Sequence, residues 1–185
     1  VLPRRGAVSV DPAEVDPLVG RVVAGCRVEA PLGRGGMGAV YLARDEAGAA
    51  VVVKGLAPEL ADDPVLRQRF TREGEALRRL PRHPAMVALR AVQADATLPA
   101  IVMDHVEGTP LAWLVRGGAR LEPAAAARAA RDVAAALAVV HAQGLVHRDV
   151  KPANVIVGDD GRATLVDFGV AKDAFRTALT RTGHM

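Results

Sequence analysis

The sequence predicts an α+β fold, with a β-rich first half and a helical second half. In the first hundred residues, short apolar runs alternate with glycine and proline turns, as is typical of strands. Residues 123–143 form one alanine-rich segment in which Val133, Leu137 and Val140 recur at helical spacing. Half of the 185 residues are hydrophobic and 3% are aromatic, so the predicted core is built from Ala, Val and Leu.

Composition excludes several functional classes. The net charge is only +3, with both signs interspersed, which argues against a nucleic-acid-binding surface. No apolar run approaches the length of a membrane span, and no apolar segment follows Arg4 and Arg5 to make a signal peptide. The single cysteine, Cys26, excludes an internal disulfide and indicates the reducing cytoplasm.

The order of elements follows from these patterns. Residues 1–19, with their scattered prolines and charges, are predicted to be a flexible leader. The first half is then expected to contain strands over 22–32, 39–43 and 51–54, a helix over 65–80, and strands over 86–95 and 98–104. The second half is expected to contain a short helix over 111–115, a long helix over 123–143, and strands over 155–157 and 163–166.

A glycine-rich segment joins the first two predicted strands. It contains the pattern G-x-G-x-x-G-x-V at Gly33, Gly35, Gly38 and Val40. Glycines allow backbone amides to approach phosphates closely. A Rossmann phosphate loop has the same glycine spacing but opens a helix. Here residues 39–43 continue as a strand, which favours a strand–loop–strand arrangement.

The third predicted strand ends in a lysine, and the helix that follows carries two acids. Lys54 alone would be a solvent-facing charge, but its place after the glycine-rich segment suggests a phosphate anchor. Glu73 and Glu75 lie two positions apart, so they project from different faces of the helix.

A polar cluster follows the long helix. Residues 146–154 read V-H-R-D-V-K-P-A-N, and Asp167 lies eighteen residues after Asp149. A carboxylate such as Asp149 can orient a hydroxyl and accept its proton, and Lys151 can balance phosphoryl charge. The amide oxygen of Asn154 and the carboxylate of Asp167 are hard ligands suited to Mg²⁺.

Together, H-R-D-x-K-x-x-N and D-F-G in this order and spacing resemble the catalytic and metal-binding motifs of the protein kinase family. Lys151 is the variant found in Ser/Thr kinases, and the wording of the loop is most similar to the bacterial, eukaryotic-like branch. The resemblance therefore implies a kinase fold, with ATP and Mg²⁺ as cofactors and protein Ser/Thr hydroxyls as substrates.

The resemblance also assigns roles to residues. Asp149 would be the base, Lys151 its assistant, and Glu73 the partner of Lys54, while Asn154 and Asp167 would bind Mg²⁺. Leu77 would pack toward Phe168. The residues that would hold ATP are Leu32, Gly33, Arg34, Gly35, Gly36, Met37, Gly38, Val40, Lys54, Met103, Asp104 and Val106.

By the same resemblance the chain divides into an N-lobe at 20–103, a hinge at 104–108 and a partial C-lobe at 109–185. The N-lobe is expected complete and the helical C-lobe only partly present, because no A-P-E motif follows the activation segment. In that segment Thr177, Thr180 and Thr182 are candidate autophosphorylation sites, with Arg148 as the phosphate partner.

Three hypotheses follow. The first is an ATP-dependent Ser/Thr protein kinase, or its N-terminal portion, located in the cytoplasm even where the parent protein is anchored in a membrane. The second is a truncated, inactive nucleotide-binding or interaction module. The third is a small-molecule kinase. It is disfavoured by Lys151 and by His83-Pro84, which resembles the H-P-x-x-V segment of the protein kinase family.

Overall fold

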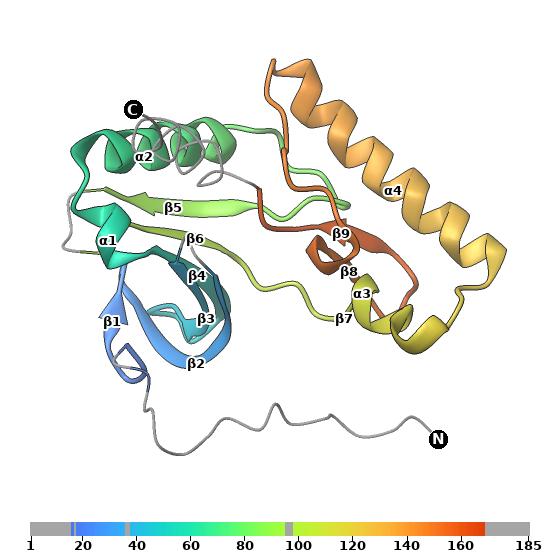
Figure 1. The fold of residues 1–185 in the computed structure, drawn as a ribbon, viewed down its shortest axis with the longest axis horizontal. Coiled ribbons are helices and arrows are strands. Elements are labelled where there is room, and N and C mark those ends of the chain that lie inside the picture. Colours follow the sequence, from blue (N-terminus) through green and yellow to red (C-terminus); the bar gives the residue numbers. More distant parts are fainter. Residues whose placement is uncertain (1–15, 17, 36–37, 95–97, 169–185) are drawn as a thin grey trace, which may run out of the picture.

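The computed structural model describes residues 16, 18–35, 38–94 and 98–168, with the side chains of residues 58, 59 and 73 left aside. In this part of the chain, one half is a six-stranded antiparallel sheet in the order β1-β2-β3-β4-β6-β5 (Figure 1). Its strands are β1 (Val22–Val23), β2 (Cys26–Gly35), β3 (Gly38–Arg44), β4 (Ala50–Leu56), β5 (Leu89–Gln93) and β6 (Ala100–Asp104). The predicted β-rich first half is confirmed.

The first strand differs from its prediction. The expected strand over 22–32 is broken at Ala24 and Gly25, whose φ angles of 51° and 75° turn the chain back on itself. A short hairpin results, in which Val23 pairs with Cys26. Strand β2 then continues to Gly35, three residues beyond the predicted end. Cys26 is buried, and its thiol lies 3.6 Å from the carbonyl oxygen of Ala24.

Two helices cover one face of the sheet (Figure 1). Helix α1 (Pro58–Ala61) was not among the predicted elements, and α2 (Pro64–Arg78) matches the predicted helix. Helix α2 begins where the Asp63 carboxylate accepts hydrogen bonds from the amides of Val65 and Leu66, at 2.8 and 3.2 Å. Phe70 projects from it into the core and is almost fully buried.

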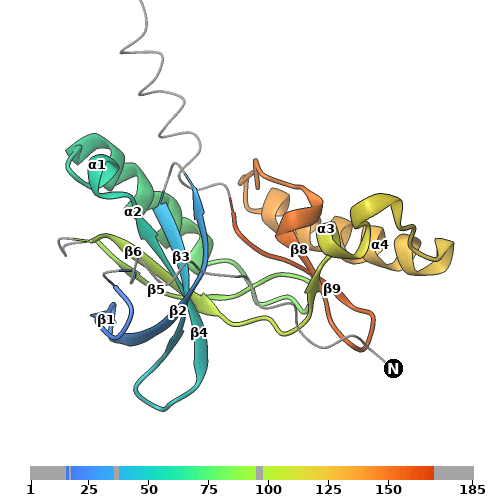
Figure 2. The same ribbon diagram turned by 60° about the horizontal axis from the view of Figure 1, so that its bottom comes forward.

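The second half is built on a long helix and a small sheet (Figure 2). Its elements are β7 (Thr109–Pro110), α3 (Leu111–Leu114), a 3-10 turn at Arg116–Gly118, α4 (Pro123–Ala142), a 3-10 turn at Pro152–Asn154, β8 (Val155–Val157) and β9 (Ala163–Leu165). Strands β7, β8 and β9 pair antiparallel in that order. Helix α4 buries Ala129, Ala136 and Val140 beneath the half-buried Val133 and Leu137.

The predicted strand over 86–95 is shortened at its start. Met86 forms an isolated parallel bridge with Leu165 of β9 instead of joining β5. This bridge links the two halves directly, and the amide of Val87 adds a 3.0 Å hydrogen bond to the Leu165 carbonyl. No helix among the described residues is both long and apolar enough to cross a membrane.

Strand β4 divides its side chains between two environments. Val51 and Val53 are buried in a cluster on the outer face of the sheet, together with Val28, Tyr41 and Val102. Because successive side chains of a strand point to opposite faces, Val52 and Lys54 point the other way and line a cleft. This alternation places the only charged side chain of β4 at the candidate site.

Candidate active site

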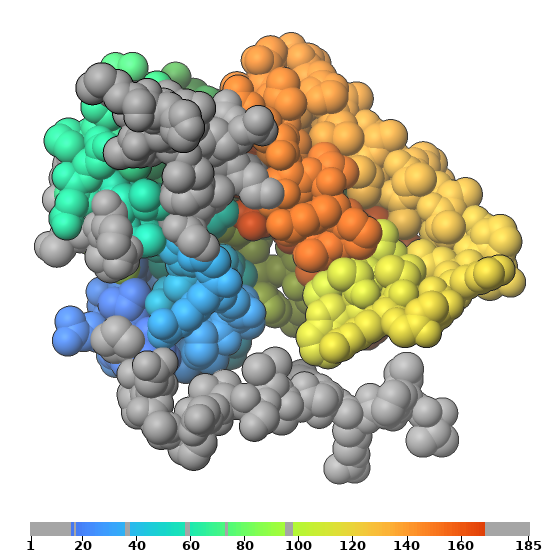
Figure 3. Space-filling view, in the orientation of Figure 1, coloured from blue at the N-terminus to red at the C-terminus, as the bar shows by residue number. Residues whose placement is uncertain are grey.

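A cleft of about 740 Å³ lies between the six-stranded sheet and the second half. Figure 3 shows a hollow between the blue and the yellow-to-orange surfaces. Four segments contribute to it: the end of β4, the segment after β6, the glycine-rich hairpin formed by β2 and β3, and the polar loop 146–154 after α4. Of the residues predicted to hold ATP, those that line the cleft are Leu32, Gly33, Arg34, Gly35, Gly38, Val40, Lys54, Met103, Asp104 and Val106. Gly36 and Met37 lie outside the described residues.

The glycine-rich hairpin packs tightly at one glycine and is open at two others. Gly38 has a φ of 139°, and a Cβ atom there would lie 1.9 Å from the carbonyl oxygen of Gly55. A side chain is therefore excluded at position 38 by the close approach of β3 to β4. Gly33 and Gly35 have open space where a Cβ would be, so they leave room at the mouth of the cleft.

An ion pair joins the two sides of the cleft. The Lys54 ammonium of β4 pairs with the Asp167 carboxylate just after β9, and the Lys54 side chain is only 14% exposed. The predicted partner, Glu73, has its backbone in α2, but its side chain lies outside the described part of the structure. The Lys54–Glu73 pair therefore stays a prediction, and Lys54–Asp167 is the contact that the structure places here.

The polar loop after α4 closes around one carboxylate. Asp149 is 9% exposed, and its Oδ2 atom accepts hydrogen bonds from Lys151 Nζ and Asn154 Nδ2, each at 3.0 Å. Asn154 Nδ2 also donates to the Asp149 carbonyl at 2.8 Å. Because the Asn154 amide donates through nitrogen, its carbonyl oxygen keeps its lone pairs for a cation. The predicted residues Asp149, Lys151, Asn154 and Asp167 all line the same cleft.

His147 anchors this loop through a buried ring contact and a hydrogen bond. It is almost fully buried and stacks against Phe168, with ring centroids 4.6 Å apart. Its Nδ1 atom accepts a 3.3 Å hydrogen bond from the Asp149 amide. Burial lowers the pKa of His147, although the Val166 backbone and nearby carboxylates oppose this shift. The neutral imidazole that results can accept at Nδ1. Phe168 lies in the same buried cluster as Leu77, as predicted.

Two residues beside the site have strained backbone. Arg148 has a φ of 65° and Asp167 a φ of 54°, in the left-handed region that side chains other than glycine usually avoid. Arg148 follows the buried His147, and the amide of Val166, just before Asp167, donates a 2.9 Å hydrogen bond to the Asn154 carbonyl. Such strain persists where surrounding contacts fix the chain, and it is commonly found at functional sites.

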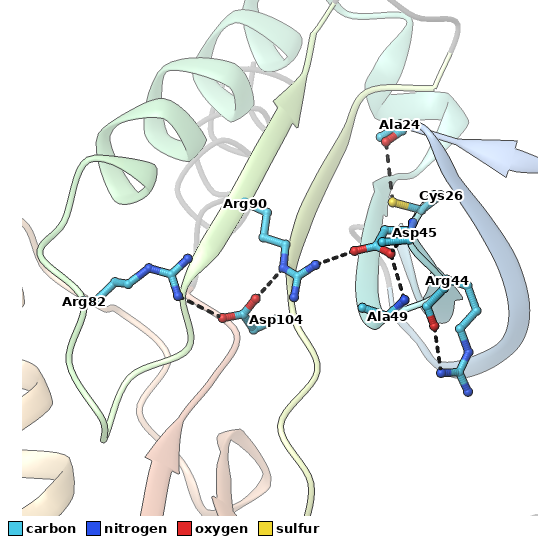
Figure 4. Close-up of polar contacts among 10 residues, drawn as sticks. Ala24, Cys26, Arg44, Asp45, Ala49, Arg82, Arg90 and Asp104 are labelled. Atoms are coloured by element: carbon cyan, nitrogen blue, oxygen red, sulfur yellow. Dashed lines mark hydrogen bonds and ion pairs between the residues drawn. The ribbon is translucent and has the colours of Figure 1, made fainter.

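Ion pairs hold the end of β6, where the segment that follows it begins. The Asp104 carboxylate pairs with Arg90 and, at 3.6 Å, with Arg82, and Arg90 also contacts Asp45 at 2.7 Å (Figure 4). The hydrogen bond to Asp104 raises the pKa of Arg90. The Asp104 amide donates to the Ala88 carbonyl at 2.9 Å, which leaves the Asp104 carbonyl as its possible ligand contact.

Sequence reasoning missed this ion-pair network. Arg90 lies 14 residues from Asp104 and 45 from Asp45, so no local pattern connects them. The only sequence signal was the presence of paired charges near turns and strand ends, which is common on any surface.

The family follows from a comparison with known proteins. The model of the protein kinase domain matches residues 26–183, which is most of the chain. This chain belongs to the protein kinase family. The predicted kinase-like fold is thereby confirmed.

Relatives and solved structures of this family agree. The Serine/threonine-protein kinase PkaA of Streptomyces coelicolor is 41% identical over 170 residues, covering 84% of this chain and 31% of PkaA. PknD of Mycobacterium tuberculosis is 40% identical over 153 residues, covering 82% of this chain and 23% of PknD. The kinase domain of M. tuberculosis PknI superposes with a TM-score of 0.71 at 35% identity, covering 82% of this chain and 61% of that domain. This chain thus spans less than a third of those two relatives.

The kinase site has oxygen donors that suit Mg²⁺. Asn154 and Asp167 lie on the same wall, and Asn154 Nδ2 is 3.5 Å from the Asp167 carbonyl. The described residues contain no cluster of three His, Cys, Asp or Glu side chains that could hold a metal by themselves. Mg²⁺ is commonly held by one or two protein groups together with substrate phosphates and water. The residues present therefore fit a nucleotide-bound Mg²⁺.

Proposed function

We propose that this chain is the catalytic portion of an ATP-dependent Ser/Thr protein kinase. One observation carries the proposal. A carboxylate, Asp149, is oriented by Lys151 and Asn154 on one wall of a cleft, and the other wall presents the lysine Lys54 of β4 beside the glycine-rich hairpin. Base, cation and phosphate anchor thus face a single space. The names of the relatives PkaA and PknD favour Ser/Thr over other substrates.

Nucleotide binding would use the wall of the cleft that the six-stranded sheet and the segment after β6 form, called here the upper wall. Val40 and Met103 are apolar and suit an adenine ring, while the Asp104 carbonyl and the Val106 backbone can hydrogen-bond its edge. The glycines allow the hairpin backbone to approach the phosphates. Lys54 would exchange Asp167 for phosphate oxygens. In a solved Rad53 structure in complex with AMP-PNP, which is 26% identical with a TM-score of 0.68 and covers 79% of this chain and 38% of that one, an ATP analogue is bound by this fold.

Phosphoryl transfer would use the opposite wall, formed by the polar loop after α4 and by Asp167, called here the lower wall. The substrate hydroxyl oxygen forms a bond to the γ-phosphorus while the bond to the β–γ bridging oxygen breaks, and ADP leaves. Asp149 accepts the hydroxyl proton, and the Lys151 ammonium balances charge on the moving phosphoryl group. Bound Mg²⁺, held by Asn154 and Asp167, would neutralise phosphate charge. Glu73 would position Lys54.

Regulation would follow the family pattern. We place autophosphorylation at Thr177, Thr180 or Thr182, which lie outside the described residues, with Arg148 as the partner of the new phosphate. We place the chain in the cytoplasm, because the buried free thiol of Cys26 suits a reducing compartment.

Intact mass spectrometry after incubation with Mg-ATP tests this function. The wild-type chain should gain one or more phosphoryl groups, and peptide mapping should place them at the three threonines. Asp149→Asn should gain none, because the base is lost while the shape of the site is kept. Omitting Mg²⁺ should also abolish the gain. Equal labelling of wild type and Asp149→Asn would contradict the assignment of Asp149.

A nucleotide-binding module without transfer activity is the second candidate. This module would show cooperative melting and stabilisation by Mg-ATP but no phosphoryl gain, with or without an added protein substrate. A phosphoryl gain that depends on Asp149 would exclude it.

A further inference from the structure

A carboxylate from the segment before the family match reaches the glycine-rich hairpin. Asp16 precedes residues 26–183, which match the protein kinase domain, and it was predicted to belong to a flexible leader. Residues 1–15 and 17 of that leader lie outside the described residues, but Asp16 is only 6% exposed. A buried carboxylate needs compensating partners, because burial without them is costly.

Asp16 finds these partners on both strands of the hairpin. Its Oδ2 atom pairs with Arg34 Nη2 of β2 at 2.5 Å, and its Oδ1 atom accepts a 3.3 Å hydrogen bond from the Tyr41 hydroxyl of β3. The Leu18 amide donates to the same Oδ1 at 3.0 Å. One side chain therefore connects the leader, β2 and β3.

The contact on β2 lies at the nucleotide end of the hairpin. Arg34 stands between Gly33 and Gly35, pairs in register with Ala39 of β3, and lines the cleft. Gly33 and Gly35 have open space where a Cβ would be, so a fixed contact on Arg34 restrains this part of the hairpin beside the cleft. Tyr41, in the middle of β3, is buried in the cluster on the outer face of the sheet.

The charge states favour a lasting contact. Burial raises the pKa of Asp16, but the Leu18 amide, Arg34 and Tyr41 together hold it below its ordinary value. Burial and the Asp16 charge raise the pKa of Tyr41, so its hydroxyl stays a donor. At neutral pH the carboxylate is thus ionised, with a cation on one oxygen and a phenol on the other.

We propose that Asp16 is a positioning residue that clamps both strands of the glycine-rich hairpin and so sets nucleotide affinity. This inference rests on the proposed function, in that the cleft is taken to bind ATP. It adds to that function a determinant outside the segment shared with the family model. Asp16 acts through Arg34 and Tyr41.

A matched control exists on the same strand pair. Glu29 of β2 and Arg44 of β3 form an exposed ion pair at 3.1 Å, at the end of the hairpin far from Gly35 and Gly38. Glu29→Gln removes a charge pair between the same strands without touching the cleft. It separates a loss of general sheet stability from a loss of clamping.

The test is the dissociation constant of Mg-AMP-PNP, measured by calorimetry for the whole 185-residue chain. Asp16→Asn should weaken binding by roughly three- to tenfold, as expected for one partly buried ion pair, and Glu29→Gln should leave it unchanged. In an Arg34→Gln background, Asp16→Asn should have little further effect, because its main partner is already lost. Equal affinity of wild type and Asp16→Asn, or a full additional loss in the Arg34→Gln background, would overturn the proposal.

Hydrogen exchange separates this proposal from the proposed function. Peptides covering β2 and β3 should exchange faster in Asp16→Asn than in Glu29→Gln, whether or not nucleotide is bound. The chain could bind Mg-AMP-PNP with this dependence on Asp16 and yet transfer no phosphate. That result would contradict the kinase function and support the role proposed for Asp16. Unchanged exchange in a variant that still melts cooperatively would overturn the clamp by itself.

Discussion

The two walls of the cleft are built in different ways. The upper wall consists of strands, and it offers backbone, glycines and the apolar Val40 and Met103, with Lys54 and Arg34 as cations. The lower wall offers charged and amide side chains gathered around the carboxylate of Asp149. A ligand that is recognised by shape and backbone suits the first wall, and a reaction that needs charge suits the second. The proposed function thus assigns binding and chemistry to separate regions.

The scaffolds of the two walls also differ. The sheet behind the upper wall is buried on both faces, by an outer cluster that includes Val51 and by an inner cluster that includes Phe70. The lower wall rests on α4 and the hairpin of β8 and β9, in which Val140 and Leu165 are the largest fully buried side chains. The two walls thus share one buried cluster, because Phe70, Val140 and Leu165 all belong to it, whereas the outer cluster lies on the sheet alone.

The largest expected effect comes from exchanging one lysine on each wall. Lys54→Met should lower kcat/KM by about 100-fold or more and weaken nucleotide binding, because the phosphate anchor is lost. Lys151→Met should lower kcat by roughly tenfold and leave nucleotide affinity near that of the wild type. Steady-state kinetics and calorimetry with Mg-AMP-PNP measure both. If Lys151→Met weakened the binding of Mg-AMP-PNP as much as Lys54→Met does, the division between the walls would be wrong.

A smaller effect is expected from two glycines of the upper wall. Gly38→Ala should lower the free energy of unfolding by about 2–4 kcal/mol, because its Cβ would lie 1.9 Å from the Gly55 carbonyl oxygen at a strained φ. Gly35→Ala, which has open space, should stay within about 1 kcal/mol of the wild type. Urea unfolding measures both. Equal stability of the two variants would show that β3 does not approach β4 this closely.

The smallest effect is a pH dependence of the lower wall. Burial keeps the pKa of His147 below its usual value of 6.5, so the folded state favours the neutral ring. Its contribution to stability is fully present above pH 6.5 and is lost as the pH falls below it, because the unfolded state then binds the proton more readily. His147→Gln should show a flatter decline in melting temperature on acidification. An unchanged decline would mean that other groups cause it.

Much of this molecule could be predicted from local sequence. The run from Val51 to Lys54 predicted a strand, and the strand-like residues 39–43 after the glycines predicted a loop between strands. The spacing of Asp149, Lys151 and Asn154 predicted a cluster that the fold does form. These features depend on backbone preferences and side-chain periodicity, which act over a few residues. The sequence itself contains that information.

Other features were decided only by the tertiary structure. The Lys54–Asp167 pair joins residues 113 positions apart, and the Asp16–Arg34 pair joins a predicted leader to the glycine-rich hairpin. The network of Arg90 with Asp45 and Asp104 had no sequence signal. A charged side chain pairs with whichever opposite charge the packing of distant elements brings within reach, and burial decides which of these contacts exclude water. The kinds of residues at the site are thus set by the sequence, whereas their partners are set by the fold.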